Sequence, residues 1–312
     1  MHYPPAAMPD PDAAAPSQPE TPDPEEAERG ETGPAGISIE AERGARMSPA
    51  AAVAAIRIRV PVRGNRILRD VVARVNADVH LKALWHVANV NAVRRMQIND
   101  HSWVHIQIVT NLGLKLLRDL GRAGVEPSMV ADYGMTPEDA EVVVALGCFL
   151  HCTGMAVHRR GHEDWSLFLA ADMLPRLLEG IYEEPERTVI TAEVLQTITA
   201  HRKDGQPLSL EAGIVRVADA LDMAKGRSRI VFEAGRVTMH SLSAQAVEAV
   251  RILPGVERHL LIEIEMNNSA GVYQVDELLR PKLRGSGLEP YVEVVARIEG
   301  EAEKMLVPVF RL

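Results

Sequence analysis

Three of the chain's eleven histidines fall within a stretch of twelve residues, at the end of an apolar run. His151 and Cys152 close that run, and His158 and His162 follow shortly after. Imidazole is the commonest metal ligand in proteins, and histidines gathered at the end of a buried helix are typical of a metal site. The stretch 145–162 therefore predicts a centre for a divalent metal ion.

The elements that must position this stretch are mostly helices. A threonine, a proline and two acids at 136–139 make a strong helix start, because they cap the backbone and suit the positive end of the helix dipole. We expect that helix to end at His151. Two later helices would contribute His201, at the end of one, and Asp219, on another that Ser209 caps.

The chain before this helix start is also expected to be helical, with one exception. Residues 55–63 alternate between apolar and mostly basic side chains, which predicts a short strand with one buried face. Residues 65–96 change to a helical period that fits two or three helices. His101 and His105 are four residues apart, so on a helix they would share one face.

After the last of these helices the pattern becomes mixed. Strands are expected at 236–239, 260–266 and 291–298, with helical segments at 244–250 and 275–283 between them. This order is typical of a small α+β sandwich. We therefore expect a small C-terminal domain that differs in architecture from the helical part.

Charge and proline separate a third part at the N-terminus. Residues 1–50 hold half of the twenty prolines and a net charge of −7. Such a segment buries too little apolar area to offset the entropy lost on ordering, so a disordered acidic tail is expected. The predicted parts are a tail over 1–50, a helical metal-binding domain over 51–226 and an α+β domain over 227–312.

Composition also excludes several classes of protein. The formal charge of −9 leaves only −2 outside the tail, which argues against a broad nucleic-acid-binding surface. No run approaches about 18 apolar residues and no secretory signal is evident, so no membrane span is expected. Cys148 and Cys152 lie four apart, an arrangement that disfavours a disulfide and fits a reducing cytoplasm. A homo-oligomer is compatible with the sequence.

The order His105, His151-Cys152, Asp219 resembles the HD superfamily of metal-dependent phosphohydrolases. That family is named for a His-Asp pair at the end of a core helix, with an earlier His and a later Asp on other helices. Here the segment His105-Ile-Gln-Ile-Val109 resembles the family's first motif. The segment that begins at Asp219 and continues Ala-Leu-Asp resembles its last helix.

The resemblance extends over about residues 98–226. The stretch from His201 to Asp219 is also similar to the HD-GYP cyclic-dinucleotide phosphodiesterases, in which a His before an acidic-Gly turn reaches the metals. The implied fold is mostly α: an HD-type helical bundle with a small C-terminal α+β domain and a disordered N-terminal tail. The implied activity is hydrolysis of a small phosphorylated substrate, a nucleotide or related phosphate ester, by a metal-activated water.

The resemblance also implies roles for individual residues, around one or two ions of manganese, iron, zinc or magnesium. The metal ligands would be His105, His151, Cys152, His162, His201 and Asp219. Residues that orient the substrate or transfer a proton would be His101, His158, Arg159 and Lys203. The cations that could bind the substrate phosphate are Arg160, Arg202, Lys225, Arg227 and Arg229.

Cys152 departs from the family pattern, because it stands where the family has Asp. In two-metal members that Asp bridges the ions, whereas a thiolate would favour zinc or iron over magnesium or manganese. Three alternatives follow. The chain is an active phosphohydrolase, a catalytically impaired protein that binds nucleotides in a regulatory role, or a protein with a closed, structural zinc site.

Overall fold

The computed structural model describes residues 48–202, 204–224 and 243–299, and the backbone of 309–311. Two compact units divide the chain, Met1–Gly36 and Ile37–Leu312, and everything described belongs to the second. The predicted tail lies outside the described residues except at its end, where a helix already begins at Pro49. Lys203, Lys225, Arg227, Arg229 and the predicted strand 236–239 also lie outside them, as does the predicted domain boundary at 226.

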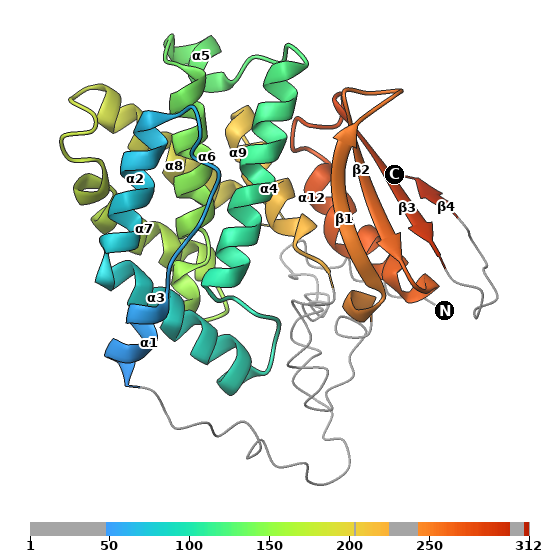
Figure 1. Cartoon of the computed structure of the whole chain (residues 1–312), viewed down its shortest axis with the longest axis horizontal. Coiled ribbons are helices and arrows are strands. Elements are labelled where there is room, and N and C mark those ends of the chain that lie inside the picture. The colour runs from blue at the N-terminus through green and yellow to red at the C-terminus, as the bar shows by residue number, and fades with distance from the viewer. Residues whose placement is uncertain (1–47, 203, 225–242, 300–308, 312) are drawn as a thin grey trace, which may run out of the picture. The chain divides into compact units, whose positions relative to one another are not determined.

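The described chain up to residue 224 is helical (Figure 1). Its elements are α1 (Pro49–Ala55), α2 (Arg66–Ala77), α3 (Val79–Asn89), the π-helix η3 (Val90–Met96), α4 (Trp103–Arg122), α5 (Ser128–Tyr133), α6 (Pro137–Leu150), the 3-10 turn η4 (Thr153–Ala156), α7 (His162–Leu178), α8 (Glu186–Ala200) and α9 (Leu210–Leu221). The expected helical bundle is confirmed, including the two or three helices predicted over 65–96.

Helix α6 is the centre of this bundle and contacts α2, α4, α8 and α9. Its start follows the sequence motif: the Thr136 side chain accepts from Asp139 N, and the Asp139 carboxylate accepts from Thr136 N. Residues 142–150 are all buried. The span Pro137–Ala156 is long and apolar enough to cross a membrane, but 89% of it is buried within the fold. A core helix passes the same test, and the packing of α6 fits that role.

The strand predicted over residues 55–63 is wrong, although the alternation behind it is real. Ile56 and Ile58 are buried while Arg57 and Arg59 are exposed. The segment forms no strand with any described part of the chain. Instead, Ile58 is bound by the side chain of Asn76. Nδ2 of Asn76 donates to Ile58 O, and Oδ1 of Asn76 accepts from Ile58 N. An extended segment that packs on helices therefore gives the same period of two as a strand.

The C-terminal part has a four-stranded sheet in the order β1-β2-β3-β4. Its elements are β1 (Val247–Pro254), β2 (Leu260–Met266), the 3-10 turn η5 (Ser269–Gly271), the π-helix η6 (Gln274–Leu279), α12 (Arg280–Leu283), β3 (Val292–Ile298) and β4 (Val309–Arg311). The β2–β3 pair is parallel, and η5, η6 and α12 make the crossover between them. The other two pairs are antiparallel. A small α+β part is thereby confirmed.

One element of this part was predicted wrongly. A helix is predicted over residues 244–250, but only 244 and 245 are helical and β1 begins at Val247. Val250 pairs with Ile264 and Ile252 with Ile262 across the hairpin. Apolar cross-strand pairs of this kind stabilise a sheet enough to override the helix preference of the alanines in the segment.

Candidate metal centre

Five buried histidines converge on one region of the helical bundle, mostly from helix ends. Their rings follow one another in the order His101, His105, His151, His201 and His162, with ring centroids 5.6, 5.3, 5.0 and 5.6 Å apart. We call these five residues the histidine cluster. Its members come from the loop before α4, the first turn of α4, the C-cap positions that follow α6 and α8, and the start of α7. Residues far apart in the sequence are thus brought to one place.

Three ligand atoms of this region form a nearly equilateral triangle. Nε2 of His105 lies 3.3 Å from Nε2 of His151, and Oδ1 of Asp219 lies 3.4 Å and 3.5 Å from the same two atoms. A metal ion with bonds of about 2.1 Å in tetrahedral geometry holds its ligands about 3.4 Å apart. The donor set therefore fits a divalent ion without rearrangement.

The outward nitrogen of each ring in the histidine cluster has a hydrogen-bond acceptor. For His105 the acceptor is Asp222 Oδ2, 2.6 Å from Nδ1. For the other four rings it is a backbone carbonyl oxygen: Asn99 O at 2.7 Å from His101 Nδ1, Cys148 O at 2.8 Å from His151 Nδ1, Arg159 O at 3.2 Å from His162 Nδ1 and Ile198 O at 2.5 Å from His201 Nδ1. A ring that donates through Nδ1 presents the lone pair of Nε2 on its other side. For His105 and His151 that side faces the triangle.

Cys152 belongs to two groups of residues that could each hold a metal ion. Among the described residues, His105, His151 and Cys152 form one group that could hold a metal ion, and Cys152, His162 and His201 form another. Within each group the ligand atoms lie within 4.8 Å of one another. Cys152 is shared, as a bridging ligand would be, and its sulfur favours zinc or iron. Both thiols of the chain are free, as expected from their spacing.

Electrostatics divide the histidines into two kinds. Burial is the main reason why the pKa values of His162 and His201 lie well below the ordinary one. Burial also lowers the pKa of His151, but the charges of Cys152 and Asp219 and their hydrogen bonds outweigh it and raise that pKa to about 10. His162 and His201 are thus neutral near pH 7 and ready to act as ligands. If His151 binds a metal ion, that binding would be coupled to the release of a proton.

The end of α6, which carries His151, is fixed by its neighbours. Trp85 Nε1 donates to Phe149 O at 2.9 Å, and Ser166 Oγ donates to His151 O at 2.7 Å. A Cβ on Gly154 would lie 1.9 Å from the carbonyl oxygen of His162, so glycine allows the start of α7 to approach this turn. These contacts hold His151 and His162 at a fixed separation.

The structure leaves some predicted site residues away from the histidine cluster. His158 is exposed and its Nδ1 accepts from the backbone N of Arg160, which is also exposed. Arg202 pairs with Asp164 and Asp204 at the surface. None of these three contacts the triangle, and their roles stay predictions.

Two other residues lie close to the cluster. Half-buried Arg159 contacts His162 through its carbonyl oxygen. His101 precedes α4 rather than lying on it, so the expected shared helix face is wrong. Its ring nevertheless lies next to His105, because the loop turns it inward.

Sequence reasoning missed two contacts of the site. Asp222 binds Nδ1 of His105, although the sequence indicates only that it repeats a family motif. Lys282 approaches Asp219 from a segment 63 residues further along the chain, and no sequence signal points to it.

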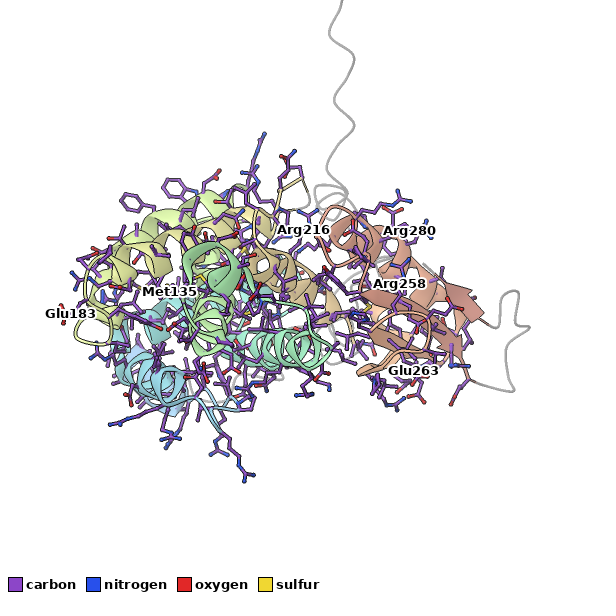
Figure 2. The ribbon with its side chains drawn as sticks, turned by 90° about the horizontal axis from the view of Figure 1, so that it is seen from above. Met135, Glu183, Arg216, Arg258, Glu263 and Arg280 are labelled. Atoms are coloured by element: carbon purple, nitrogen blue, oxygen red, sulfur yellow. The ribbon has the colours of Figure 1, made fainter. Side chains whose placement is uncertain are left out.

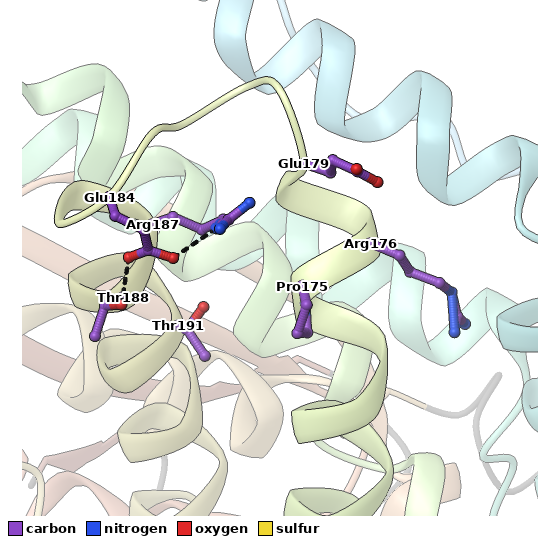
Figure 3. A pocket seen from close by; sticks show the side chains of 7 residues that line it. All are labelled: Pro175, Arg176, Glu179, Glu184, Arg187, Thr188 and Thr191. Carbon is purple, nitrogen blue, oxygen red and sulfur yellow. Dashed lines mark hydrogen bonds and ion pairs between the residues drawn. The ribbon is translucent and has the colours of Figure 1, made fainter.

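A separate surface pocket of about 460 Å³ lies between the end of α7 and the start of α8 (Figure 3). Pro175, Arg176, Glu179, Glu184, Arg187, Thr188 and Thr191 line it. Pro175 is thirteen residues from His162 along α7, which is about 20 Å. Glu184 accepts from Arg187 and Thr188 there. This pocket is not part of the histidine cluster.

Comparison with known proteins places the chain in a family. A family model described as the HD domain matches residues 103–224, from the start of α4 to just beyond Asp222. An uncharacterized protein of Methanocaldococcus jannaschii, MJ1020, is 40% identical over 215 residues, which cover 69% of this chain and 83% of that protein. No solved structure shows significant similarity. The chain belongs to the HD-domain family, whose members are generally metal-dependent hydrolases.

Proposed function

We propose that this protein is a metal-dependent phosphohydrolase that cleaves a phosphate ester, in a nucleotide or a related small compound. The observation that carries the proposal is the triangle of His105 Nε2, His151 Nε2 and Asp219 Oδ1. Its two rings are oriented by acceptors at Nδ1, as in catalytic metal sites. A structural ion pair or a buried apolar core would not need such an arrangement.

The chain's own residues would prepare the site for hydrolysis. A divalent ion, when bound, supplies an activated water and neutralises charge on the phosphate oxygens. His105, His151 and Asp219 would hold it, while Asp222 and the Cys148 carbonyl keep the two rings in position. All three ligands are at most 8% exposed, so their electrostatic interactions are stronger than in water. His101, beside His105, remains the candidate for proton transfer.

Activity assays with matched histidine variants test the proposal. Metal-depleted protein is reloaded with manganese, magnesium, zinc or iron and assayed against mono-, di- and cyclic nucleotides. His151→Gln should lose activity by about 100-fold or more, because it removes a ligand, whereas His80→Gln, at an exposed site on α3, should not. Wild-type protein that takes up metal but hydrolyses none of these compounds would count against the proposal.

Cys152 favours a second candidate function, a regulatory module that binds nucleotides without turnover. The residue shared by both ligand groups is a soft thiol instead of the family's hard carboxylate. Cys152→Asp discriminates between the two candidates. A large gain in turnover supports an impaired natural site, and unchanged turnover undermines that idea. If chelation of the metal unfolds the protein instead of silencing it, the zinc is structural. A cytoplasmic location and self-association stay predictions.

A further inference from the structure

A lysine from the C-terminal part reaches the proposed metal ligands. Nζ of Lys282, on α12, lies 2.5 Å from Oδ2 of Asp219. The other oxygen of the same carboxylate faces His105 and His151. Because α12 follows the residues that match the HD domain, this cation is an addition to that domain. Its side chain is 19% exposed against 10% for Asp219, so part of it is accessible to solvent.

The charge of Lys282 acts on other residues of the site as well. Burial and the charge of His151 are the larger reasons for the lowered pKa of His201, and Lys282 lowers it further. Burial raises the pKa of Glu163, at the start of α7. Its own backbone N–H and the charges of Arg202 and Arg159 oppose this shift, and Lys282 adds a smaller opposing effect. The charge of Lys282 thus affects the pKa values of His201 and Glu163, in addition to its direct contact with Asp219.

Arg216 fixes the backbone that carries Lys282. This arginine of α9 is 2% exposed and lies where α9 meets the C-terminal part (Figure 2). Its Nε donates to Lys282 O at 2.9 Å and one terminal nitrogen donates to Pro281 O at 3.1 Å. The other terminal nitrogen donates to Ala200 O and Arg202 O, on either side of His201. One side chain thus ties Lys282 and the His201 turn to the helix that carries Asp219.

A glycine on α9 shows that this contact is close-packed. A Cβ on Gly213 would lie 1.9 Å from the carbonyl oxygen of Ser286, which follows α12. The segment that carries Lys282 therefore lies directly on the α9 backbone. This close packing holds the backbone that carries Lys282 in place.

We propose that Lys282 is a phosphate-binding residue that the C-terminal part adds to the HD site, an inference that rests on the proposed function. An ammonium group is a compact charge with three donors, well suited to a phosphate oxygen. Lys282 adjoins the carboxylate that would hold the ion, so an anionic ester that joins the ion must approach the lysine. An ion held by Asp219 would offset the charge of its carboxylate, which would leave the Lys282 ammonium group available to bind a phosphate oxygen.

Titrations with manganese and then with inorganic phosphate test this role. Lys282→Met should bind manganese within about threefold of wild type, because the ligands are intact, and bind phosphate at least about tenfold more weakly. Lys282→Arg should restore most of the phosphate affinity. Arg284→Met is the matched control, since it removes an exposed cation two residues away. Thermal melting checks that each variant folds; if Lys282→Met does not, Lys282→Gln replaces it.

The outcomes separate this inference from the proposed function. The inference is overturned if phosphate binds the Lys282→Met variant as tightly as it binds the wild-type protein. It is also overturned if the manganese-loaded wild-type protein binds no phosphate. Parallel loss of manganese and phosphate affinity assigns Lys282 a purely structural role. If wild type hydrolyses no substrate yet loses phosphate affinity on Lys282→Met, the proposed function fails while the phosphate site stands. With a substrate in hand, Lys282→Met should raise KM more than it lowers kcat.

Discussion

Nδ1 of His105 lies 2.6 Å from Oδ2 of Asp222, while Nε2 of the same ring lies 3.4 Å from Oδ1 of Asp219. The two carboxylates follow one another at the end of α9, and the ring lies between them. A carboxylate behind a histidine fixes its tautomer and makes it a stronger ligand. Asp222 is therefore a positioning residue for His105, a proposed metal ligand.

Replacing Asp222 by Asn should weaken metal binding. The amide keeps the shape of the side chain but removes the charge that supports His105, so affinity for manganese or zinc should fall about 10- to 100-fold. Calorimetric titration of metal-depleted protein measures this. Asp172→Asn, whose side chain is 79% exposed on α7, is the control and should bind like wild type. If both variants bind the metal ion with equal affinity, Asp222 has no positioning role in the site.

Glu211→Gln should stabilise the protein at high pH. Burial is the main reason why the pKa of Glu211 is raised above 4.5, its value in the unfolded chain. The folded state therefore retains a proton that the unfolded state has lost, and stability falls as pH rises from about 4.5 through the folded pKa. Glutamine can still accept from Met129 N through its carbonyl oxygen.

Thermal unfolding at pH 5 and pH 8 checks this expectation. The gain in Tm for Glu211→Gln should be larger at pH 8, because the carboxyl group is then ionised in the unfolded chain while burial opposes its ionisation in the folded one. Glu126→Gln is the control, because Glu126 is exposed on the surface. The same gain at both pH values would show that burial of charge at Glu211 does not affect stability.

Gly154→Ala should disrupt the site and the fold together. The new Cβ would overlap His162 O, so the start of α7 must move away from the turn that follows His151. We expect a loss of stability of about 2 kcal/mol or more. Gly121→Ala, in α4 with no atom near the added Cβ, should instead stabilise by about 0.5–1 kcal/mol. Denaturant unfolding compares the two, and a stable Gly154→Ala with full metal affinity would contradict the packing described.

Trp85→Phe should weaken the attachment of the α6 end. It removes the indole donor from Phe149 O and leaves that buried carbonyl with one hydrogen bond fewer, at a cost of about 1–3 kcal/mol. Trp165→Phe makes the same change at a side chain that is 45% exposed and should cost little. Chemical denaturation measures both. If the Trp85→Phe and Trp165→Phe variants have similar free energies of unfolding, the Trp85 hydrogen bond contributes no net stability.

The sequence was sufficient to predict which of the proposed ligands lie close together, but not which other residues surround them. His105, His151, His201 and Asp219 follow local motifs, since each lies at or near a helix end whose capping residues are adjacent in the chain. The helix start at 136–139 is likewise local. These features depend on neighbours within a few residues, which the sequence displays directly.

The features that sequence analysis missed depend on distant partners. The alternating segment 55–63 packs on helices, whereas β1 pairs with β2 where a helix is predicted, and in both cases the distant partner decides the structure. Lys282 reaches Asp219 through a crossover between β2 and β3, and nothing in its own neighbourhood indicates this contact. Contacts between residues that are distant in the chain produce no periodic pattern or characteristic spacing in the sequence, so they cannot be predicted from it.

Anomalous diffraction from crystals of the manganese- or zinc-loaded protein would show whether the triangle binds a metal ion. We predict a peak bonded to His105 Nε2, His151 Nε2 and Asp219, at about 2.0–2.2 Å from each ligand atom. A second peak beside His162, His201 and Cys152 would extend the site to two ions. A metal-loaded crystal with no peak inside the triangle, or with its only peaks elsewhere, would show that the triangle is not a metal site.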